Sequence, residues 1–190
     1  ESYDSYTQGP TLEAKDKDGN PLASKAVTIT FNGKTYKRTT DGNGIARLNI
    51  NLPSGEYVAN VTVDDITVNA TVTVLPTVSG SDVRKVYGQK ASYNATFLDS
   101  TGKYLSKGTI VSFNINGEIQ NKTISDDGLA SLNINLPVGE YIVTATNQVT
   151  GEKTSNIITV ISRLVENEDV VKIYGSSTPY TVKAIGDNGK

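Results

Sequence analysis

An internal repeat constrains this chain more than any other feature. Residues Leu48–Tyr57 (LNINLPSGEY) return as Leu132–Tyr141 (LNINLPVGEY), 84 positions later, with nine of the ten residues identical. The similarity extends backwards, where Val27–Gly33 parallels Val111–Gly117. A fixed period of this length predicts a tandem array of similar units, each with its own core.

The repeat also sets the expected unit boundaries. Thr40–Leu48 parallels Ser125–Leu132, and a third copy begins late in the chain because Val83–Gly88 returns as Val170–Gly175. The expected organisation is repeat 1 at residues 1–76, repeat 2 at 77–162, and the opening strands of a truncated third repeat at 163–190.

Within each unit the apolar residues alternate with polar ones, as at Val27, Ile29 and Phe31. This period of two is typical of half-buried strands, and turn sequences such as Asn32–Gly33 and Asp41–Gly44 separate them. No segment carries a helical stripe. Short strands separated by frequent turns predict an all-β fold of tandem immunoglobulin-like β-sandwich domains. A single closed barrel is the structural rival, and the internal repeat argues against it.

The alternation also predicts which residues form the two cores. The expected first core contains Ile29, Phe31, Leu48, Tyr57 and Val61, and the second contains Phe113, Ile115, Leu132, Tyr141 and Val143.

Composition excludes several classes of function. The chain has no Cys, His, Met or Trp, so thiol and imidazole chemistry, disulfides and the usual zinc ligands are absent. A net charge of −2 without a basic cluster makes nucleic acid an unexpected partner. No apolar stretch approaches the ~20 residues that span a bilayer, so we expect no membrane insertion.

Several motifs resemble one family. Val86–Gly88, Asp18–Leu22, Val27–Gly33 and Gly55–Tyr57, with their second-copy counterparts, are similar to the bacterial-type immunoglobulin-like repeats of adhesin-like cell-surface proteins, particularly those of methanogenic archaea. The resemblance covers nearly the whole chain. It implies an extracellular, cell-surface location and a stalk or adhesive role without catalysis or cofactor. Copy two departs from the pattern where Tyr104 replaces the proline of the first hairpin.

One loop has a spacing of carboxylates that suits calcium. Asp16–Asn20 places oxygen ligands at alternate positions, but the loop is too short for an EF-hand and lacks its closing Glu. The counterpart Asp99–Lys103 has lost two of the oxygens. A hairpin turn is the favoured interpretation, since Asp, Asn and Gly populate turns, and no metal site is expected.

Lys15 is the candidate for a Lys–Asn isopeptide bond of the kind that staples some cell-surface sandwiches. In domains resembling that class the Lys precedes the hairpin glycine by five residues, whereas Lys15 precedes Gly19 by four. A slip of one residue turns a side chain to the opposite face. The inward position is then Ala14, with Phe97 and Ala184 in the later copies, and Lys15 is expected to be solvated.

Other polar residues have simpler interpretations. Glu56 and Glu140 are expected beside water at strand starts. The tyrosines are expected to pack in the core or on strand faces with their hydroxyls at the rim, and glycan stacking on exposed rings is the alternative; they are Tyr57, Tyr87, Tyr93, Tyr141 and Tyr174. The Asn-X-Ser/Thr sequons make Asn60, Asn69, Asn94 and Asn121 candidate N-glycosylation sites.

Two functions compete. A spacer projects a terminal binding region and contacts neighbouring repeats, whereas a specific binder holds a glycan or a protein of another cell through its own loops or a strand face. The copies differ chiefly in a modestly longer hairpin, Asn147–Lys153 against Asp64–Asp65, which favours the spacer. No paired carboxylates recur at matching positions in the two copies, so an enzyme is not expected.

The opening strands raise a question of self-association. Copy two opens with Val78–Val86, for which copy one has almost nothing before Tyr3, while Val165–Ala184 supplies opening strands to a third copy. Exposed strand edges recruit partners. Head-to-tail completion of copy one by another molecule is therefore one hypothesis, and a tail that pairs along copy two or stays mobile is the other.

Overall fold

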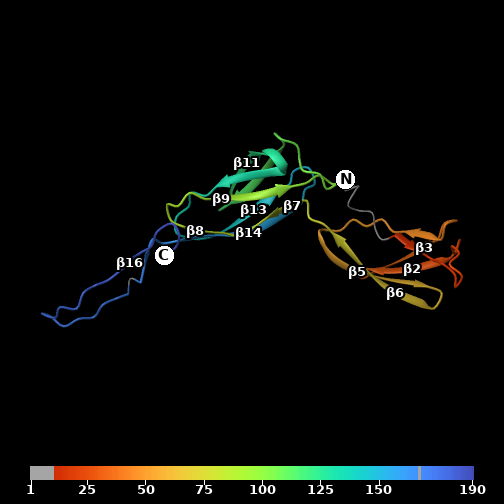
Figure 1. Ribbon diagram of the computed structural model, residues 1–190, viewed down its shortest axis with the longest axis horizontal. Helices are drawn as coiled ribbons and strands as arrows, with labels where there is room; N and C mark the ends of the chain where they lie inside the picture. The colour runs from red at the N-terminus through yellow and green to blue at the C-terminus, as the bar shows by residue number, and fades with distance from the viewer. Residues whose placement is uncertain (1–10, 167) are drawn as a thin grey trace. The chain divides into compact units, whose positions relative to one another are not determined.

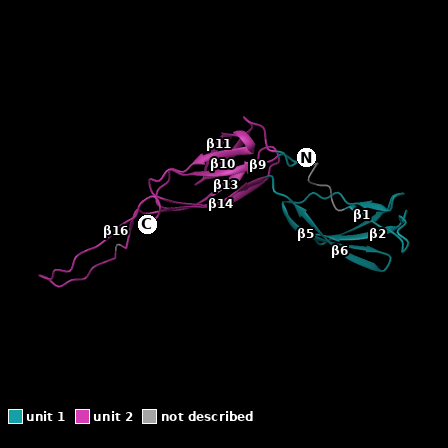
Figure 2. Ribbon diagram, in the orientation of Figure 1, with its two compact units in different colours: residues 1–77, 99–103 teal, residues 78–98, 104–190 magenta. Residues whose placement is uncertain are grey.

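The computed structural model describes residues 11–166 and 168–190. The chain divides into two compact units, residues 1–77 with 99–103 and residues 78–98 with 104–190 (Figure 2). The described residues form strands and one short 3-10 turn, Asp126–Gly128. The expected all-β fold class is confirmed.

Unit 1 is a two-layer sandwich (Figure 1). Its strands are β1 (Thr11–Glu13), β2 (Ala26–Phe31), β3 (Lys34–Thr39), β4 (Ile45–Arg47), β5 (Gly55–Val63) and β6 (Ile66–Val74). β1 pairs with β4 in one layer, and the other layer has the order β3-β2-β5-β6, antiparallel throughout.

Unit 2 repeats this arrangement and adds strands to both layers. Its strands are β7 (Val78–Gly80), β8 (Val83–Val86), β9 (Ser92–Phe97), β10 (Ile110–Ile115), β11 (Glu118–Thr123), β12 (Leu129–Asn133), β13 (Gly139–Thr146) and β14 (Lys153–Ile161). One sheet has the order β12-β9-β7 and the other β11-β10-β13-β14-β8. The chain changes sheet between β7 and β8, and β8 runs parallel to β14. Apart from this parallel edge the pairs are antiparallel, and two packed sheets with this strand order form an immunoglobulin-like sandwich.

The cores lie where the alternation placed them. Ile29, Phe31, Leu48 and Val61 are buried in unit 1, and so are their predicted partners in unit 2, namely Phe113, Ile115, Leu132 and Val143. Tyr57 and Tyr141 are partly buried and pack against the margin of their cores. The core prediction is confirmed, with the two tyrosines at the margin.

The structure corrects one alignment of the two copies. Thr40 N–H donates to the carbonyl of Lys25, and Ile124 N–H makes the same bond to Thr109. Thr40 therefore corresponds to Ile124 and not to Ser125, and the offset of 84 residues holds without a gap through this turn. An alignment by residue type alone starts the second-copy segment at Ser125, one residue too late.

The turn glycines Gly44 and Gly128 explain why this segment recurs. Both have positive φ, +75° and +67°, and a Cβ would lie 2.5 Å from the carbonyl oxygens of Ala14 and Phe97, respectively. Only glycine accepts both the conformation and the close approach.

After β14 the chain forms a short ladder, in which β15 (Leu164–Val165) pairs with β16 (Lys183–Ala184). The pairing is antiparallel, as it is between β7 and β9 in unit 2. Ala184 is exposed, which contradicts its expected inward position. The register was inferred from copies in which a second sheet covers this face, and among the described residues no such sheet faces β16.

Candidate functional site

The aspartates of the hairpin turns bind their own backbone. Asp16 Oδ1 accepts hydrogen bonds from the N–H groups of Asp18 (2.8 Å) and Asn20 (2.9 Å), and Oδ2 accepts from Asn20 Nδ2 (3.1 Å). The bond from the Asn20 backbone is the largest cause that holds the pKa of Asp16 below its usual range. The hairpin interpretation is confirmed. Within residues 11–166 and 168–190 no group of three or more His, Cys, Asp or Glu side chains is placed to hold a metal ion.

Lys15 lies in solvent, as expected. Its ammonium is 3.0 Å from Glu13 Oε1 and both side chains are about half exposed, at 49% and 53%. Ala14 and Phe97 are the buried residues at this strand end. The phase of the strand therefore turns Lys15 away from the core, where an isopeptide bond would have to form.

A buried lysine lies instead on β8, where sequence reasoning did not look. Lys85 is only 4% exposed, and its Nζ donates a 2.8 Å hydrogen bond to the carbonyl oxygen of Ile134, just after β12. This bond joins β8, in the five-stranded sheet, to the residue that follows β12, a strand of the three-stranded sheet. The sequence does mark this lysine, because it stands inside the apolar motif Val83–Gly88 and recurs as Lys172 in Val170–Gly175.

β8 and β14 form the parallel edge of the five-stranded sheet. Val83, Arg84, Lys85 and Val86 pair with Ile158, Thr159, Val160 and Ile161. The N–H of Tyr87 extends the ladder with a 2.8 Å bond to Ile161. Thus β8, the second strand of unit 2, is bonded along its length to the last strand of the sandwich.

The repeated Leu-Pro-X-Gly-Glu-Tyr motif builds a tyrosine corner. Tyr57 Oη donates to the carbonyl of Pro53 (2.8 Å), and Tyr141 Oη donates to that of Pro137 (3.1 Å). Such a bond fixes the turn that leads into the strand. Their hydroxyls lie at the rim, as predicted. The glutamates of the motif, Glu56 and Glu140, are exposed, which confirms their expected place beside water.

The other tyrosines divide into two groups. Tyr93 is fully buried, and its hydroxyl donates a 2.7 Å bond to Asn156 Oδ1 inside unit 2. Burial, with a smaller effect of Asp82, raises the pKa of Tyr93 to about 12. Tyr87 and Tyr174 are 53% and 103% exposed, so the prediction that they pack in the core or on a strand face is wrong.

All four sequon asparagines are exposed. Asn60 and Asn69 pair directly across β5 and β6. Asn94 Oδ1 accepts a 2.6 Å hydrogen bond from Ser131 Oγ, and Asn121 lies on the edge strand β11.

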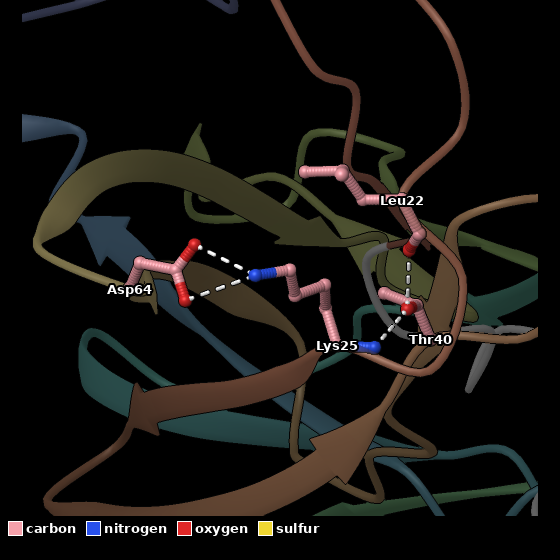
Figure 3. A network of polar contacts seen from close by, with 4 residues as sticks. All are labelled: Leu22, Lys25, Thr40 and Asp64. Carbon is pink, nitrogen blue, oxygen red and sulfur yellow. Dashed lines mark hydrogen bonds and ion pairs between the residues drawn. The ribbon is translucent and has the colours of Figure 1, made fainter.

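A polar network ties the turns of unit 1 together (Figure 3). The buried Thr40 hydroxyl accepts from the N–H of Lys25 (2.8 Å) and donates to the carbonyl of Leu22 (2.6 Å). The Lys25 ammonium reaches the two carboxylate oxygens of Asp64 at 3.2 and 3.4 Å. In unit 2 the equivalent of Thr40 is the buried, apolar Ile124, so this network belongs to one copy only.

Two shallow grooves lie on unit 2. The larger, about 380 Å³, lies beside β7 and β9 and is lined mainly by small polar side chains, including Ser79, Asp82, Ser92, Asn94 and Thr96. The smaller, about 290 Å³, lies at the β10–β11 hairpin and contains Asn116, Gln120 and Asn135. Hydroxyls and amides of this kind can hydrogen-bond sugar hydroxyls, but neither groove brings together residues suited to acid–base or nucleophilic chemistry.

One family model matches part of the chain. Residues 10–73 match the model of the macroglobulin domain MG4. This segment covers most of unit 1 and less than half of the chain. No curated protein matches the sequence.

The comparison with solved structures finds proteins of low identity to this chain. Invasin, a bacterial integrin-binding protein, is 19% identical, with a TM-score of 0.34 over 79% of this chain and 35% of its own. The adhesin InvE of Yersinia pseudotuberculosis is 18% identical, with a TM-score of 0.35 over 81% of this chain and 55% of its own. Domains 4 and 5 of the S-layer protein SbsC are 18% identical, with a TM-score of 0.29 over 78% and 79%. The chain thus spans about a third and about half of the first two structures.

None of the described residues forms a helix with the length and hydropathy that crossing a bilayer requires.

Proposed function

We propose that this chain is a structural, adhesive stalk segment of a cell-surface, adhesin-like protein, which carries tension along its length and presents a binding region beyond it. The observation that carries the proposal is the parallel pairing of β8 with β14. The chain reaches the sandwich of unit 2 through β7 and β8 and leaves it after β14.

The parallel pairing of β8 with β14 determines the direction in which tension loads their hydrogen bonds. Force along the chain reaches the N-terminal end of β8 through β7, which pairs with β9 in the other sheet, and pulls the C-terminal end of β14 in the opposite direction. Because the strands run the same way, this force shears the ladder and loads its bonds together. Unzipping would break them one at a time. The geometry therefore resists a pull along the chain.

Lys85 reinforces this edge. Its bond to the Ile134 carbonyl fixes β8 to a segment beyond its own sheet, so that β8 cannot leave without exposing a buried charge and a buried carbonyl. Hydrogen bonds of charged groups are among the stronger ones in proteins, and a buried polar group left unpaired is costly.

Single-molecule pulling tests the proposal with two geometries on the same chain. Handles at the two termini shear the β8–β14 ladder. Cysteine handles at Ser81→Cys and Val149→Cys pull from the ends at which both strands begin and so unzip it; the chain has no native Cys, and both positions are exposed. We expect unit 2 to unfold at a clearly higher force in the terminal geometry. Equal or lower force there would overturn the stalk proposal.

A Lys85→Ala variant tests the buried bond. It should lower the terminal unfolding force of unit 2 and its free energy of unfolding by about 1–3 kcal/mol, because the Ile134 carbonyl is left buried and unpaired. The exposed Lys90→Ala is the matched control and should change neither.

Direct binding is the second candidate, in which unit 2 holds a glycan or a protein of another cell. The polar groove beside β7 and β9 supports it, since its serine, threonine and asparagine side chains suit sugar hydroxyls. A glycan array probed with the full chain separates the two functions. Specific retention of one glycan that is lost in Ser79→Leu would favour the binder.

The remaining expectations belong to the same proposal. Residues 1–76 and 77–162 are two repeats, 163–190 opens a third, and the parent is an exported archaeal surface protein whose repeats contact one another, without enzymatic activity and without nucleic acid as a partner. Asn60, Asn69, Asn94 and Asn121 are then its glycan acceptors. Intact mass after expression in a glycosylating host measures their occupancy. Asn60 and Asn69 are directly opposed, with Cβ atoms about 5 Å apart in such pairs, so we expect one glycan on this pair and not two.

A further inference from the structure

We propose that β3 of unit 1 is a binding site for an extended acidic polysaccharide, whose carboxylate or sulfate groups pair with Lys34, Lys37 and Arg38. The site lies on a different unit from the two polar grooves, and the inference does not depend on the stalk function.

The β2–β3 hairpin carries a local excess of positive charge. Residues Ala26–Thr39 contain Lys34, Lys37 and Arg38 and no Asp or Glu, an excess that the net charge of −2 of the whole chain hides. All three cations are exposed, and among the described residues none of them forms an ion pair. They can therefore pair with an external anion without first breaking an internal ion pair.

Arg38 is held in place by two contacts. Its guanidinium lies over the ring of Tyr36, with Cζ 5.8 Å from the ring centroid, and Nη1 donates a 2.8 Å hydrogen bond to the carbonyl oxygen of Lys37. Tyr36 itself packs against the core of unit 1. Because a guanidinium has five N–H donors, several remain for a bidentate pair with a carboxylate or sulfate. A side chain that is already held loses less entropy on binding.

The second copy shows that the fold does not require this charge. The register of β2 with β3 is repeated by β10 with β11, so the two hairpins correspond residue by residue. On β11, Glu118 takes the place of Lys34 and Asn121 takes the place of Lys37. Residues Ile110–Thr123 thus contain one acid and one cation. The same hairpin folds without the basic strand, so the strand in unit 1 is available for binding.

The number and arrangement of the cations favour a polysaccharide over a nucleic acid. Proteins that depend on the phosphate backbone of DNA make roughly 6–10 phosphate contacts, and this strand offers three cations. Lys34 and Arg38 lie on one side of the strand, about 13 Å apart at the usual rise per residue, and Lys37 lies on the other. The exposed Thr35 and Thr39 alternate with these cations and can hydrogen-bond sugar hydroxyls.

Binding to polymers of known charge tests the proposal. The full chain should bind polygalacturonate, which bears carboxylates, or chondroitin sulfate, which also bears sulfates, and its preference identifies the anion. Neutral dextran should not bind. The affinity should fall as salt rises from about 50 to 200 mM, because pairing releases counterions. Failure to bind either acidic polymer at about 50 mM salt, or equally tight binding of polyglutamate or double-stranded DNA, would overturn the proposal.

An exchange of residues between the copies tests the location of the site. Lys34→Glu with Lys37→Asn gives β3 the residues that β11 carries, and should weaken binding at least tenfold. Lys90→Glu with Lys153→Asn makes the same change of net charge at exposed positions of unit 2, and should leave the affinity within about twofold. Circular dichroism should show both variants folded. If both weakened binding equally, only the net charge of the chain would matter and β3 would not be the site.

The reverse exchange tests whether the charge pattern is sufficient. Glu118→Lys with Asn121→Lys, added to the exchanged chain, moves the cations to β11 beside Lys122 and should restore the affinity to within about fivefold. No recovery would contradict a site made by the charges of this hairpin.

A last variant separates this site from the polar groove beside β7 and β9. Ser79→Leu lies in that groove and should leave binding of the acidic polymer unchanged. Loss of binding in this variant, with binding retained after the exchange on β3, would place the polysaccharide in the groove and contradict the proposal.

Discussion

At the residue scale, Tyr93 is closely packed in the core of unit 2. Its ring is fully buried between the sheets and makes edge-on contacts with Phe113, and its hydroxyl is held by Asn156. Gly80 on β7 lies directly against this hydroxyl. A Cβ at Gly80 would be 2.2 Å from Tyr93 Oη and 2.7 Å from Cζ. The φ of Gly80 is not in the left-handed region, so its backbone conformation does not require glycine. The lack of space beside Tyr93 does.

We therefore expect Gly80→Ala to lower the free energy of unfolding of unit 2 by about 1–3 kcal/mol, the usual cost of overpacking a core. Urea denaturation measures the change. Gly42→Ala is the control, because a Cβ at Gly42 meets nothing within 4 Å and needs no positive φ. A Gly80→Ala protein as stable as the wild type would show that Tyr93 moves aside freely.

The turn aspartates predict a loss of stability in acid. The backbone N–H of Ile45, followed by that of Asn43, holds the pKa of the Asp41 carboxyl below its usual range. The pKa of Asp16 is lowered chiefly by the backbone N–H of Asn20, and that of Asp99 by the hydroxyl of Thr101 followed by the backbone N–H of Lys103. A carboxyl with a lower pKa in the folded state stabilises the fold above its unfolded pKa, and that contribution is lost as the pH falls through the folded pKa.

Thermal unfolding between pH 6 and pH 2 should thus show a falling melting temperature below about pH 4. Asp41→Asn keeps an oxygen acceptor for the turn but cannot be protonated in this range, so unit 1 of this variant should lose less stability on acidification than the wild type. The exposed Asp65→Asn serves as the control. The same acid slope in both variants would contradict the role given to Asp41.

At the element scale, the tyrosine corner fixes the entry into β5 and β13. Each hydroxyl bonds to a proline carbonyl four residues earlier, across the glycine of the same motif. This local bond accounts for the near identity of the motif in both copies, because the turn, the glycine and the tyrosine act together.

Tyr57→Phe and Tyr141→Phe should each lower the free energy of unfolding of their own unit by about 0.5–1.5 kcal/mol, the net worth of one hydrogen bond. Chemical denaturation of the single variants measures this, and Tyr87→Phe, at an exposed ring, is the control. If Tyr57→Phe lowered the free energy of unfolding of unit 2, the hydrogen bond could not be acting only within its own unit.

At the scale of the whole molecule, the two units have separate cores. The buried cluster of unit 1 runs from Val27 to Val61 in sequence, and that of unit 2 from Val78 to Val160. Each cluster joins the two sheets of its own sandwich.

We expect residues 1–76 and 77–162 to fold when expressed separately, and the full chain to unfold in two transitions. Calorimetry should assign one transition to each unit, and Gly80→Ala should move only one of them. One cooperative transition that moves as a whole with Gly80→Ala would show that the units do not fold independently.

Much of the fold and part of the candidate site follow from local sequence. Alternation with period two and turn residues are local properties, so they predicted the strands, the two cores, the outward Lys15 and the hairpin role of Asp16. The 84-residue repeat predicted two similar sandwiches, because the same pattern must bury the same face twice.

Only the tertiary structure decided which faces are covered and by what. Alternation assigns a side chain to a face, but whether a second sheet lies over that face depends on strands distant in sequence. Lys85 is buried because β8 crosses to β14 and meets the Ile134 carbonyl. Ala184 was expected to point inward but is exposed, because no second sheet among the described residues covers it, whereas its counterpart Phe97 is buried.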